Sequence, residues 1–420
     1  MSTRIDRPDA APRQRARRSL PLAYLVLLGL LGVMVVLSVL RTVTGAEDID
    51  SSGTLSATLV AAVPIGLAGL GGLWSERAGV VNIGLEGMMI LGTFGAGYFG
   101  YFYGAWQGVI GALALGALGG LIHAVATVGF GVDHIVSGVA INIIALGGTQ
   151  YLAALSFSGV PGGGQTQSPT IDELPAITLT FLTDPLKTLE GKHLFLVSDL
   201  AALLGGLLSQ LSVLTIIALA LFVGTWFVLW RTSFGLRLRS CGESPVAAES
   251  LGVNVYRYKY VAVVISGALA GLAGGFLAIV ASSNYRDGQT GGRGYIGLAA
   301  MIFGNWRPGG LLAGAGLFGY TDTVRLRSGG QSVHALLLLV AVLLLVMTVW
   351  QFRRAQRVGA GISLVIGVAA GVWYLLSSEV PGDFTGMTPY VTTLLVLALA
   401  SQRLRMPAAD GVPYRRGSAG

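Results

Sequence analysis

The stretch "PLAYLVLLGLLGVMVVLSVL", residues 21–40, decides the fold class of this chain. It contains no charged residue, and a helix of this length matches the hydrocarbon core of a membrane, about 30 Å thick. Because backbone polar groups in lipid must be satisfied within helices or a closed barrel, the sequence predicts an all-α, polytopic transmembrane helical bundle. Comparable apolar runs cover residues 55–74, 87–104, 106–130, 135–157, 210–230, 260–281, 334–352, 359–378 and 389–402.

The composition agrees with a membrane protein. Of the 420 residues, 53% are hydrophobic and 11% are charged, with a mean hydropathy of +0.71, whereas soluble domains carry about 25% charged residues. The first apolar run is too long for the core of a signal peptide, so we expect an uncleaved first helix. Cys241 is the single cysteine and the four histidines lack ligand spacing, so we expect no disulfide, metal or cofactor.

Arginine placement predicts the topology. Arginines gather before the first apolar run, in 231–259, in 353–357 and after residue 402, and the positive-inside rule assigns these stretches to the cytoplasm. The net charge of +7 therefore indicates membrane orientation and not a nucleic-acid partner. We expect a basic cytoplasmic N-terminal arm at 1–20, a transmembrane domain at 21–402 and a cytoplasmic tail at 403–420. The acidic, turn-rich segment 158–209 is predicted to be an extracytoplasmic loop.

Two regions of the chain repeat the same order of motifs. "LAGL" at 67–70 precedes "IGLEGMM" at 83–89, and "LAGL" at 269–272 precedes "IGLAAMI" at 296–302. The predicted topology gives the two copies opposite orientations, as in transporters built from inverted repeats. Two unrelated helix pairs that pack through glycine are the alternative. A hairpin at "GNWRPGG", 304–310, keeps the later arginines inside and gives ten to twelve spans.

Polar residues inside the first copy are candidates for a translocation path. Asn82 and Glu86 are four residues apart, on one face if a helix begins near Val81. A carboxylate at membrane depth is costly unless it faces water or a partner, which favours a functional role; a solvated surface loop or a helix cap is the alternative. Gly84 and Gly297, at matching places in the two copies, are assigned to the same path.

Asn142 lies in a second polar set, "DHIVSGVAINIIALGGTQ" at 133–150. Asn142 and Thr149 are seven residues apart and nearly in line on a helix, and Gly138 allows a neighbouring helix to approach closely. We assign Asn142 to the lining of the path. The alternative is that this asparagine only joins two transmembrane helices.

The loop "FGLRLRSCGESPVAAESLGVNVYRYK", 234–259, contains the most specific pattern. Ser244 can cap a helix, Pro245 suits its first turn, and Gly252 can end it in a left-handed conformation. The pattern predicts a short helix at about 244–251 in a basic cytoplasmic loop. Such a helix could lie on anionic lipid, but its small apolar face, which includes Val246 and Leu251, fits a protein groove better.

This loop resembles the "G-E-N-P-x-A-A-x-x-x-G-I" loop of ABC-transporter permeases from the branched-chain amino acid, ribose and nucleoside import branch. The stretch "SERAGVVNIGLEGMMILG", which begins at Ser75, is similar to the signature of the nucleoside permeases in that branch. The resemblance covers roughly residues 55–350 and departs from the pattern at Ser244, where the family usually has asparagine. It implies a bacterial cytoplasmic-membrane permease subunit of an ATP-driven nucleoside importer.

The resemblance also implies the partners and the role of the loop. The sequence has no G-x-x-x-x-G-K-[ST] phosphate loop, so ATP hydrolysis would belong to separate ABC ATPase subunits. A second, related permease and an extracytoplasmic substrate-binding lipoprotein would complete the assembly. The residues assigned to ATPase coupling are Gly242, Glu243, Ser244, Pro245, Ala247, Ala248, Glu249 and Gly252, with Ala247 and Ala248 in the ATPase groove and Glu243 and Glu249 at its rim.

Other functions stay open at this point. The substrate could be a simple sugar or a branched-chain amino acid, because an external receptor often selects it. A proton-coupled secondary transporter could use Glu86 as its titrating carboxylate, although it has no need for the "GESPVAAESLG" loop. A membrane scaffold or membrane enzyme is the third class, and no catalytic constellation in the sequence favours it.

Overall fold

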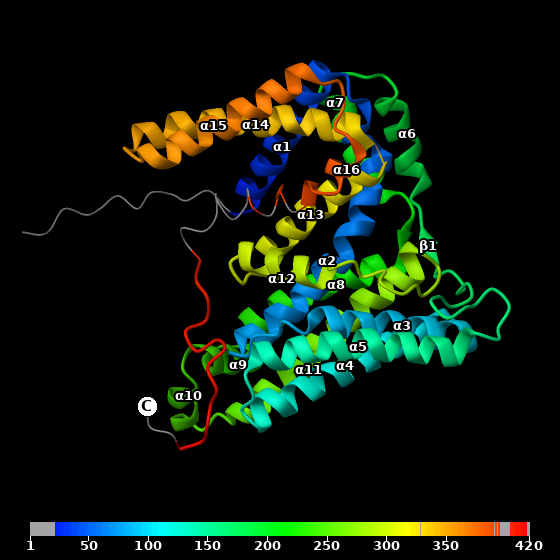
Figure 1. Ribbon diagram of the computed structural model, residues 1–420, viewed down its shortest axis with the longest axis vertical. Helices are drawn as coiled ribbons and strands as arrows, with labels where there is room; N and C mark the ends of the chain where they lie inside the picture. Colours follow the sequence, from blue (N-terminus) through cyan, green and yellow to red (C-terminus); the bar gives the residue numbers. More distant parts are fainter. Residues whose placement is uncertain (1–21, 328, 390, 393, 395–403, 418–420) are drawn as a thin grey trace, which may run out of the picture.

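The computed structural model describes residues 22–417 apart from 328, 390, 393 and 395–403, and almost all regular secondary structure in this part of the chain is helical (Figure 1). The expected N-terminal arm and most of the apolar run 389–402 lie outside the described residues. The longer helices are α1 (Leu22–Thr44), α2 (Ser52–Arg77), α3 (Leu85–Tyr103), α4 (Ala105–Ala124), α5 (His134–Phe157), α8 (Val213–Arg231), α11 (Val255–Phe276), α13 (Pro308–Arg327), α14 (Gly329–Arg353) and α15 (Arg357–Leu376).

Short elements join these helices. They are η1 (Glu47–Asp50), η2 (Val125–Gly129), α6 (Thr180–Glu190), α7 (Val197–Leu208), α9 (Ser233–Glu243), α10 (Pro245–Ser250), η3 (Leu277–Ala281), α12 (Arg293–Phe303), α16 (Gly382–Thr385) and the antiparallel two-residue strands β1 (Ala176–Ile177) and β2 (Leu211–Ser212). The π-helical turns η2 and η3 continue α4 and α11, respectively.

Seven helices in the described residues are long and apolar enough to cross a membrane. They are α2, α4 with η2, α5, α8, α11 with η3, α14 and α15. The expectation of ten to twelve spans covered the whole chain, whereas this count covers only the described residues. The 11 residues of α12 span about 16 Å, roughly half of a hydrocarbon core, and α12 turns back into α13 between Phe303 and Pro308, where the sequence predicted a hairpin.

The core is built around α2 and α11, the first helices of the two sequence repeats. α2 packs against α12 and α13 of the second copy, and α11 packs against α3 and α4 of the first copy. Glycine permits these contacts: a Cβ at Gly69 of α2 would lie 2.7 Å from the carbonyl oxygen of Gly297, and one at Gly92 of α3 would collide with the backbone of Gly271 in α11. The two copies are therefore intertwined through equivalent small-residue surfaces.

α2 has 26 residues and is therefore about 39 Å long. Its two ends lie at two different surfaces of the molecule. At its first residues, Gly206 of α7 packs against the backbone of Ser52, and Glu190 accepts a hydrogen bond from the Ser52 amide at 2.9 Å. At its last residues, Gly242 of α9 packs against the backbone of Arg77. Figure 1 shows α6 and α7 at one end of the bundle and α9 and α10 at the other.

The segment 158–209 is more ordered than the loop that its composition predicts. It contains β1, α6 and α7, and α7 packs its small residues on α2. Part of its acidic excess is neutralised inside the fold, since Asp199 is fully buried and forms an ion pair with Arg41 of α1 at 2.6 Å. The net composition of the segment could not show that pairing.

Candidate functional site

The segment before α3 holds Asn82, and here the structure corrects the sequence prediction. α3 begins at Leu85 and not near Val81, so Asn82 and Glu86 do not share a helical face. Val80 and Val81 are β-branched and disfavour a helical start, and Gly79 has a left-handed φ of +79°. Asn82 is fully buried and donates to Ser266 Oγ of α11 at 2.9 Å, so it fastens this segment to the core.

Two histidines that lie far apart in the sequence support the same segment. Nε2 of His123 lies 3.0 Å from the carbonyl oxygen of Val81, and the amide of Val81 donates to Nδ1 of His134 at 3.2 Å. Both imidazoles are buried. The sequence showed only that these histidines lack metal-ligand spacing; their role as partners of a non-helical backbone depends on the packing of α4 and α5 against it.

Glu86 caps the other copy of the repeat. It lies in the first turn of α3, is 7% exposed, and accepts hydrogen bonds from the amides of Gly292 at 2.9 Å and Gly294 at 2.7 Å. These amides belong to the start of α12, whose N-cap Gly292 is left-handed and has no side chain to offer. A carboxylate is favourable there because helix N-termini carry unpaired N–H groups and partial positive charge.

Asn142 performs the matching task for α3. Its Oδ1 accepts from the amide of Gly87 at 2.7 Å, and its Nδ2 donates to the carbonyl oxygen of Ile83 at 3.1 Å and to Tyr295 Oη at 2.9 Å. Gly87 allows this approach, since a Cβ there would lie 2.8 Å from Cα of Asn142. The side chain from α5 thus satisfies the start of α3 and joins it to α12.

Tyr295 is the residue of this site that the sequence reasoning missed. Its side chain is 47% exposed although its hydroxyl is held by Asn142. The repeat alignment contained the signal, because Tyr295 precedes "IGLAAMI" as Asn82 precedes "IGLEGMM". Gly84 and Gly297, in contrast, are buried in contacts with Gly138 and Ile65, respectively, and act there as packing positions.

Arg293 extends the polar cluster along α12 and α13. Its guanidinium donates to Asp322 Oδ2 at 2.8 Å, and Arg325 donates to Oδ1 of the same carboxylate at 2.7 Å. The helix starts of α3 and α12 therefore meet within one network of amide, carboxylate, hydroxyl and guanidinium groups. Such a network fixes the helix ends and leaves the ring of Tyr295 on an accessible face.

The second candidate surface is the predicted short helix, which the structure contains as α10. Ser244 accepts a hydrogen bond from the amide of Ala247 at 3.4 Å, Pro245 occupies the first helical position, and Gly252 has a φ of +82°. The exposed face of the helix carries Val246 and Ala247, and Leu251 follows it at 84% exposure.

Two residues assigned to the ATPase contact face inward. Ala248 is 2% exposed and packs with Cys241, Val255 and Tyr414 of its own chain. The carboxylate of Glu249 accepts hydrogen bonds from Tyr414 and Arg416 of the C-terminal tail. The helical period explains the correction, because Ala248 lies about 100° round the helix from Ala247, on the side that faces Cys241 and Val255.

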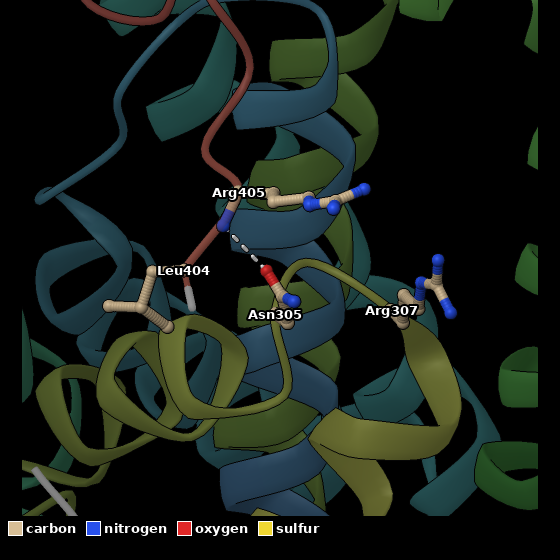
Figure 2. Close-up of a pocket in the computed structure, with 4 residues that line it drawn as sticks. All are labelled: Asn305, Arg307, Leu404 and Arg405. Carbon is tan, nitrogen blue, oxygen red and sulfur yellow. Dashed lines mark hydrogen bonds between the residues drawn. The ribbon is translucent and has the colours of Figure 1, made fainter. Parts of the chain in front are cut away.

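A hollow of about 390 Å³ lies at the turn between α12 and α13, lined by Asn305, Arg307, Leu404 and Arg405. Figure 2 shows the amide of Arg405 bonded to Asn305 Oδ1, at 2.8 Å, with the side chains of Leu404 and Arg405 on opposite sides of the tail. This hollow is one of the places where the tail meets the bundle, and it lies past the end of α12, whereas Tyr295 lies in the first turn of that helix.

Comparison with known proteins agrees with this architecture. Residues 54–349 match the family described as branched-chain amino acid transport system, permease component. No solved structure matches the chain.

Three curated relatives cover most of the chain. The guanosine ABC transporter permease protein NupQ of Bacillus subtilis is 35% identical over 86% of this chain and 96% of its own length. The nucleoside ABC transporter permease protein NupC of Lactococcus lactis is 32% identical over 85% and 94%. A putative glucose ABC transporter permease protein of Haloferax volcanii, TsgC13, is 34% identical over 87% and 98%. The chain therefore belongs to the branched-chain amino acid transport system permease family and is an integral-membrane permease subunit of an ABC transporter.

Proposed function

We propose that this chain forms the translocation path of a nucleoside importer, with Tyr295 as the side chain that meets the nucleobase. The observation that carries the proposal is an aromatic ring left 47% exposed while its hydroxyl is fixed by Asn142. Aromatic rings stack on nucleobases with about 1–3 kcal/mol per base. Relatives named for guanosine and nucleosides, similar over nearly their whole length, support this substrate class.

The interlocked helix starts give the path a mechanical role. Glu86 bonds to the amides of Gly292 and Gly294, and Asn142 bonds to the hydroxyl of Tyr295, so these hydrogen bonds cross between the two repeats. When α2 and α11 shift against each other, these crossed caps couple the start of one copy to the other, so that Tyr295 moves with both. Alternating access in transporters built from repeats proceeds by movement of one repeat or bundle against the other, and these hydrogen bonds lie at that boundary.

We assign ATP hydrolysis to partner chains. In this proposal α10 and the end of α2 that carries Arg77 face the cytoplasm, as do both termini. α10 docks an ABC ATPase subunit through Val246, Ala247 and Leu251. α6 and α7, at the opposite end of α2, receive an extracytoplasmic substrate-binding lipoprotein. A second, related permease completes the membrane part of the assembly. In support, Bacillus subtilis has two relatives with different permease names, and so does Lactococcus lactis.

Transport in proteoliposomes that contain the complete assembly tests the substrate class. ATP-dependent uptake of guanosine is expected in the wild type, Tyr295→Phe is expected to retain most of it, and Tyr295→Ala is expected to lose at least about tenfold, in line with one lost stacking contact. Tyr151→Ala, which removes an exposed tyrosine of α5, is the matched control. Unchanged guanosine uptake by Tyr295→Ala would contradict the proposal.

A glucose permease is the second candidate, favoured by the similarity to the Haloferax volcanii protein. The same proteoliposomes separate the two. Competition of labelled guanosine by unlabelled nucleosides but not by glucose supports the nucleoside path. Glucose uptake that guanosine does not inhibit would support the glucose permease.

A further inference from the structure

The C-terminal tail, residues 404–417, runs along the same end of the bundle as α9 and α10 (Figure 1). Three backbone amides fix its first part. The amide of Arg405 donates to Asn305 Oδ1 at 2.8 Å, that of Ala409 to the carbonyl oxygen of Gly242 at 2.8 Å, and that of Ala408 to Glu243 Oε2 at 3.3 Å. The tail thus joins the α12–α13 turn to the end of α9.

The next part of the tail enters the bundle at Asp410. This carboxyl lies among Glu76 and Arg77 at the end of α2 and Lys259 in the first turns of α11, and burial raises its pKa to about 7. The carbonyl oxygen of Ala409 is packed close to Gly79. The tail is therefore anchored between the first helices of the two repeats.

The last part of the tail holds α10 by its single charged residue. Tyr414 donates its hydroxyl to Glu249 Oε2 at 2.5 Å, and Arg416 Nε donates to Glu249 Oε1 at 3.1 Å. The Tyr414 ring packs beside Tyr256 of α11, with centroids 5.4 Å apart, and contributes to the apolar cluster that buries Ala248. Both oxygens of the Glu249 carboxylate thus bond to the tail.

A helix of six residues cannot hold its own conformation, because helices this short lack enough internal hydrogen bonds to offset nucleation. The tail covers the inner side of α10 and leaves Val246, Ala247 and Leu251 on the outer side. A load applied to the outer side therefore passes through Glu249, Tyr414 and Asp410 to the ends of α2 and α11. Without the tail, the same load would be absorbed by movement of α10 itself.

We propose that the C-terminal tail is a brace that positions α10 for its ATPase partner, with Glu249, Tyr414 and Arg416 as positioning residues. The inference rests on the proposed function, because it takes α10 to be the docking helix. Docking of the ATPase on α10 is then not sufficient by itself. ATP hydrolysis moves the membrane helices efficiently only when the tail also holds Glu249.

The test measures nucleoside transported per ATP hydrolysed in the reconstituted full assembly. Tyr414→Phe combined with Arg416→Ala removes both clamp bonds and is expected to lower this ratio at least about fivefold, since two hydrogen bonds to a carboxylate are lost, while the ATPase stays bound. The charge-swapped pair Glu249→Arg with Arg416→Glu is expected to transport more nucleoside per ATP hydrolysed than Glu249→Arg alone. Arg405→Ala, which removes an exposed tail arginine without touching Glu249, is expected to match the wild type.

A docking variant separates failure of the brace from failure of the proposed function. Ala247→Trp on the outer face of α10 is expected to weaken ATPase binding. If Ala247→Trp weakens binding and the clamp variants keep the wild-type ratio, the brace is overturned and the docking helix stands. If Ala247→Trp leaves binding unchanged, the docking role of α10 falls as well. A clamp variant that loses ATPase binding together with transport would also overturn the brace as a coupling element.

Discussion

The two repeats share their packing and differ in their polar groups. In both, the first helix meets the partner copy through a glycine of the "LAGL" motif, Gly69 in one and Gly271 in the other. Only the first copy carries a carboxylate, Glu86, where the second has Ala299, and only the second places an aromatic ring, Tyr295, where the first has Asn82. Small residues therefore build the shared frame of the two copies, and the polar differences between the copies supply the site.

The largest effect on stability is expected from substitutions in the glycine contacts between the two repeats. Gly271→Val would drive a side chain into the backbone of α4 and is expected to lower the free energy of unfolding by about 3 kcal/mol, the upper range for overpacking. Gly147→Val is the matched control, because within the described residues no atom lies within 4 Å of a Cβ at that position of α5. Thermal unfolding in detergent measures both, and equal midpoints for the two variants would contradict the shared frame.

The next largest effect is expected at Glu86, the carboxylate that only the first copy carries. Glu86→Gln leaves one of the amides of Gly292 and Gly294 without an acceptor, and an unpaired buried donor costs about 2 kcal/mol. Transport is expected to fall at least about tenfold while the subunit still inserts and assembles. Glu379→Gln, an exposed carboxylate at the start of the segment after α15, controls for loss of charge. Normal uptake by Glu86→Gln would show that the second copy does not need its cap from the first.

The tail links the two copies through Asp410, and this link should depend on pH. The pKa of Asp410 is raised to about 7 by burial when the tail is docked, so docking binds a proton, and its stability is present at low pH and lost as pH rises through about 7. Between pH 6 and pH 8 the docking equilibrium is expected to weaken about tenfold. Proteolysis of the tail should speed up accordingly, and Asp410→Asn should remove most of that pH dependence. A rate independent of pH in the wild type would contradict the buried placement.

The smallest effect is expected at the hydroxyl that distinguishes Tyr295 from phenylalanine. Tyr295→Phe removes one hydrogen bond of Asn142 and leaves its bonds to Gly87 and Ile83, so the expected loss of stability is about 1 kcal/mol. Tyr151→Phe on α5, where the side chain is 66% exposed, is expected to change less. A larger loss for Tyr151→Phe would show that the Asn142 contact contributes nothing specific.

Periodicity and caps sufficed to predict much of this structure. The apolar runs predicted helices at the described positions, the "GESPVAAESLG" pattern predicted α10 with its cap and terminating glycine, and "GNWRPGG" predicted the turn before α13. These features are local, because each follows from neighbours within a few residues. The repeat was also visible, since equivalent packing surfaces require similar small residues.

The remaining features depend on contacts between distant segments. The start of α3 was misplaced because Val80, Val81 and Gly79 oppose a helix that the spacing of Asn82 and Glu86 suggested. The destination of Glu86, a helix start more than two hundred residues away, cannot be read from its own surroundings. Ala248 appeared available for a partner because the sequence gives no sign that residues near its end, such as Tyr414, return to cover it.

Cysteine labelling at position 295 tests whether Tyr295 lines the translocation path. Tyr295→Cys in a Cys241→Ala background places one thiol at the accessible edge of α12, in the otherwise complete transporter. If Tyr295 lines the translocation path, a charged, membrane-impermeant thiol reagent is expected to modify this cysteine, and guanosine, but not glucose, is expected to slow the reaction. Modification only by a lipid-soluble reagent, with no effect of guanosine, would place Tyr295 against lipid and contradict its role in the path.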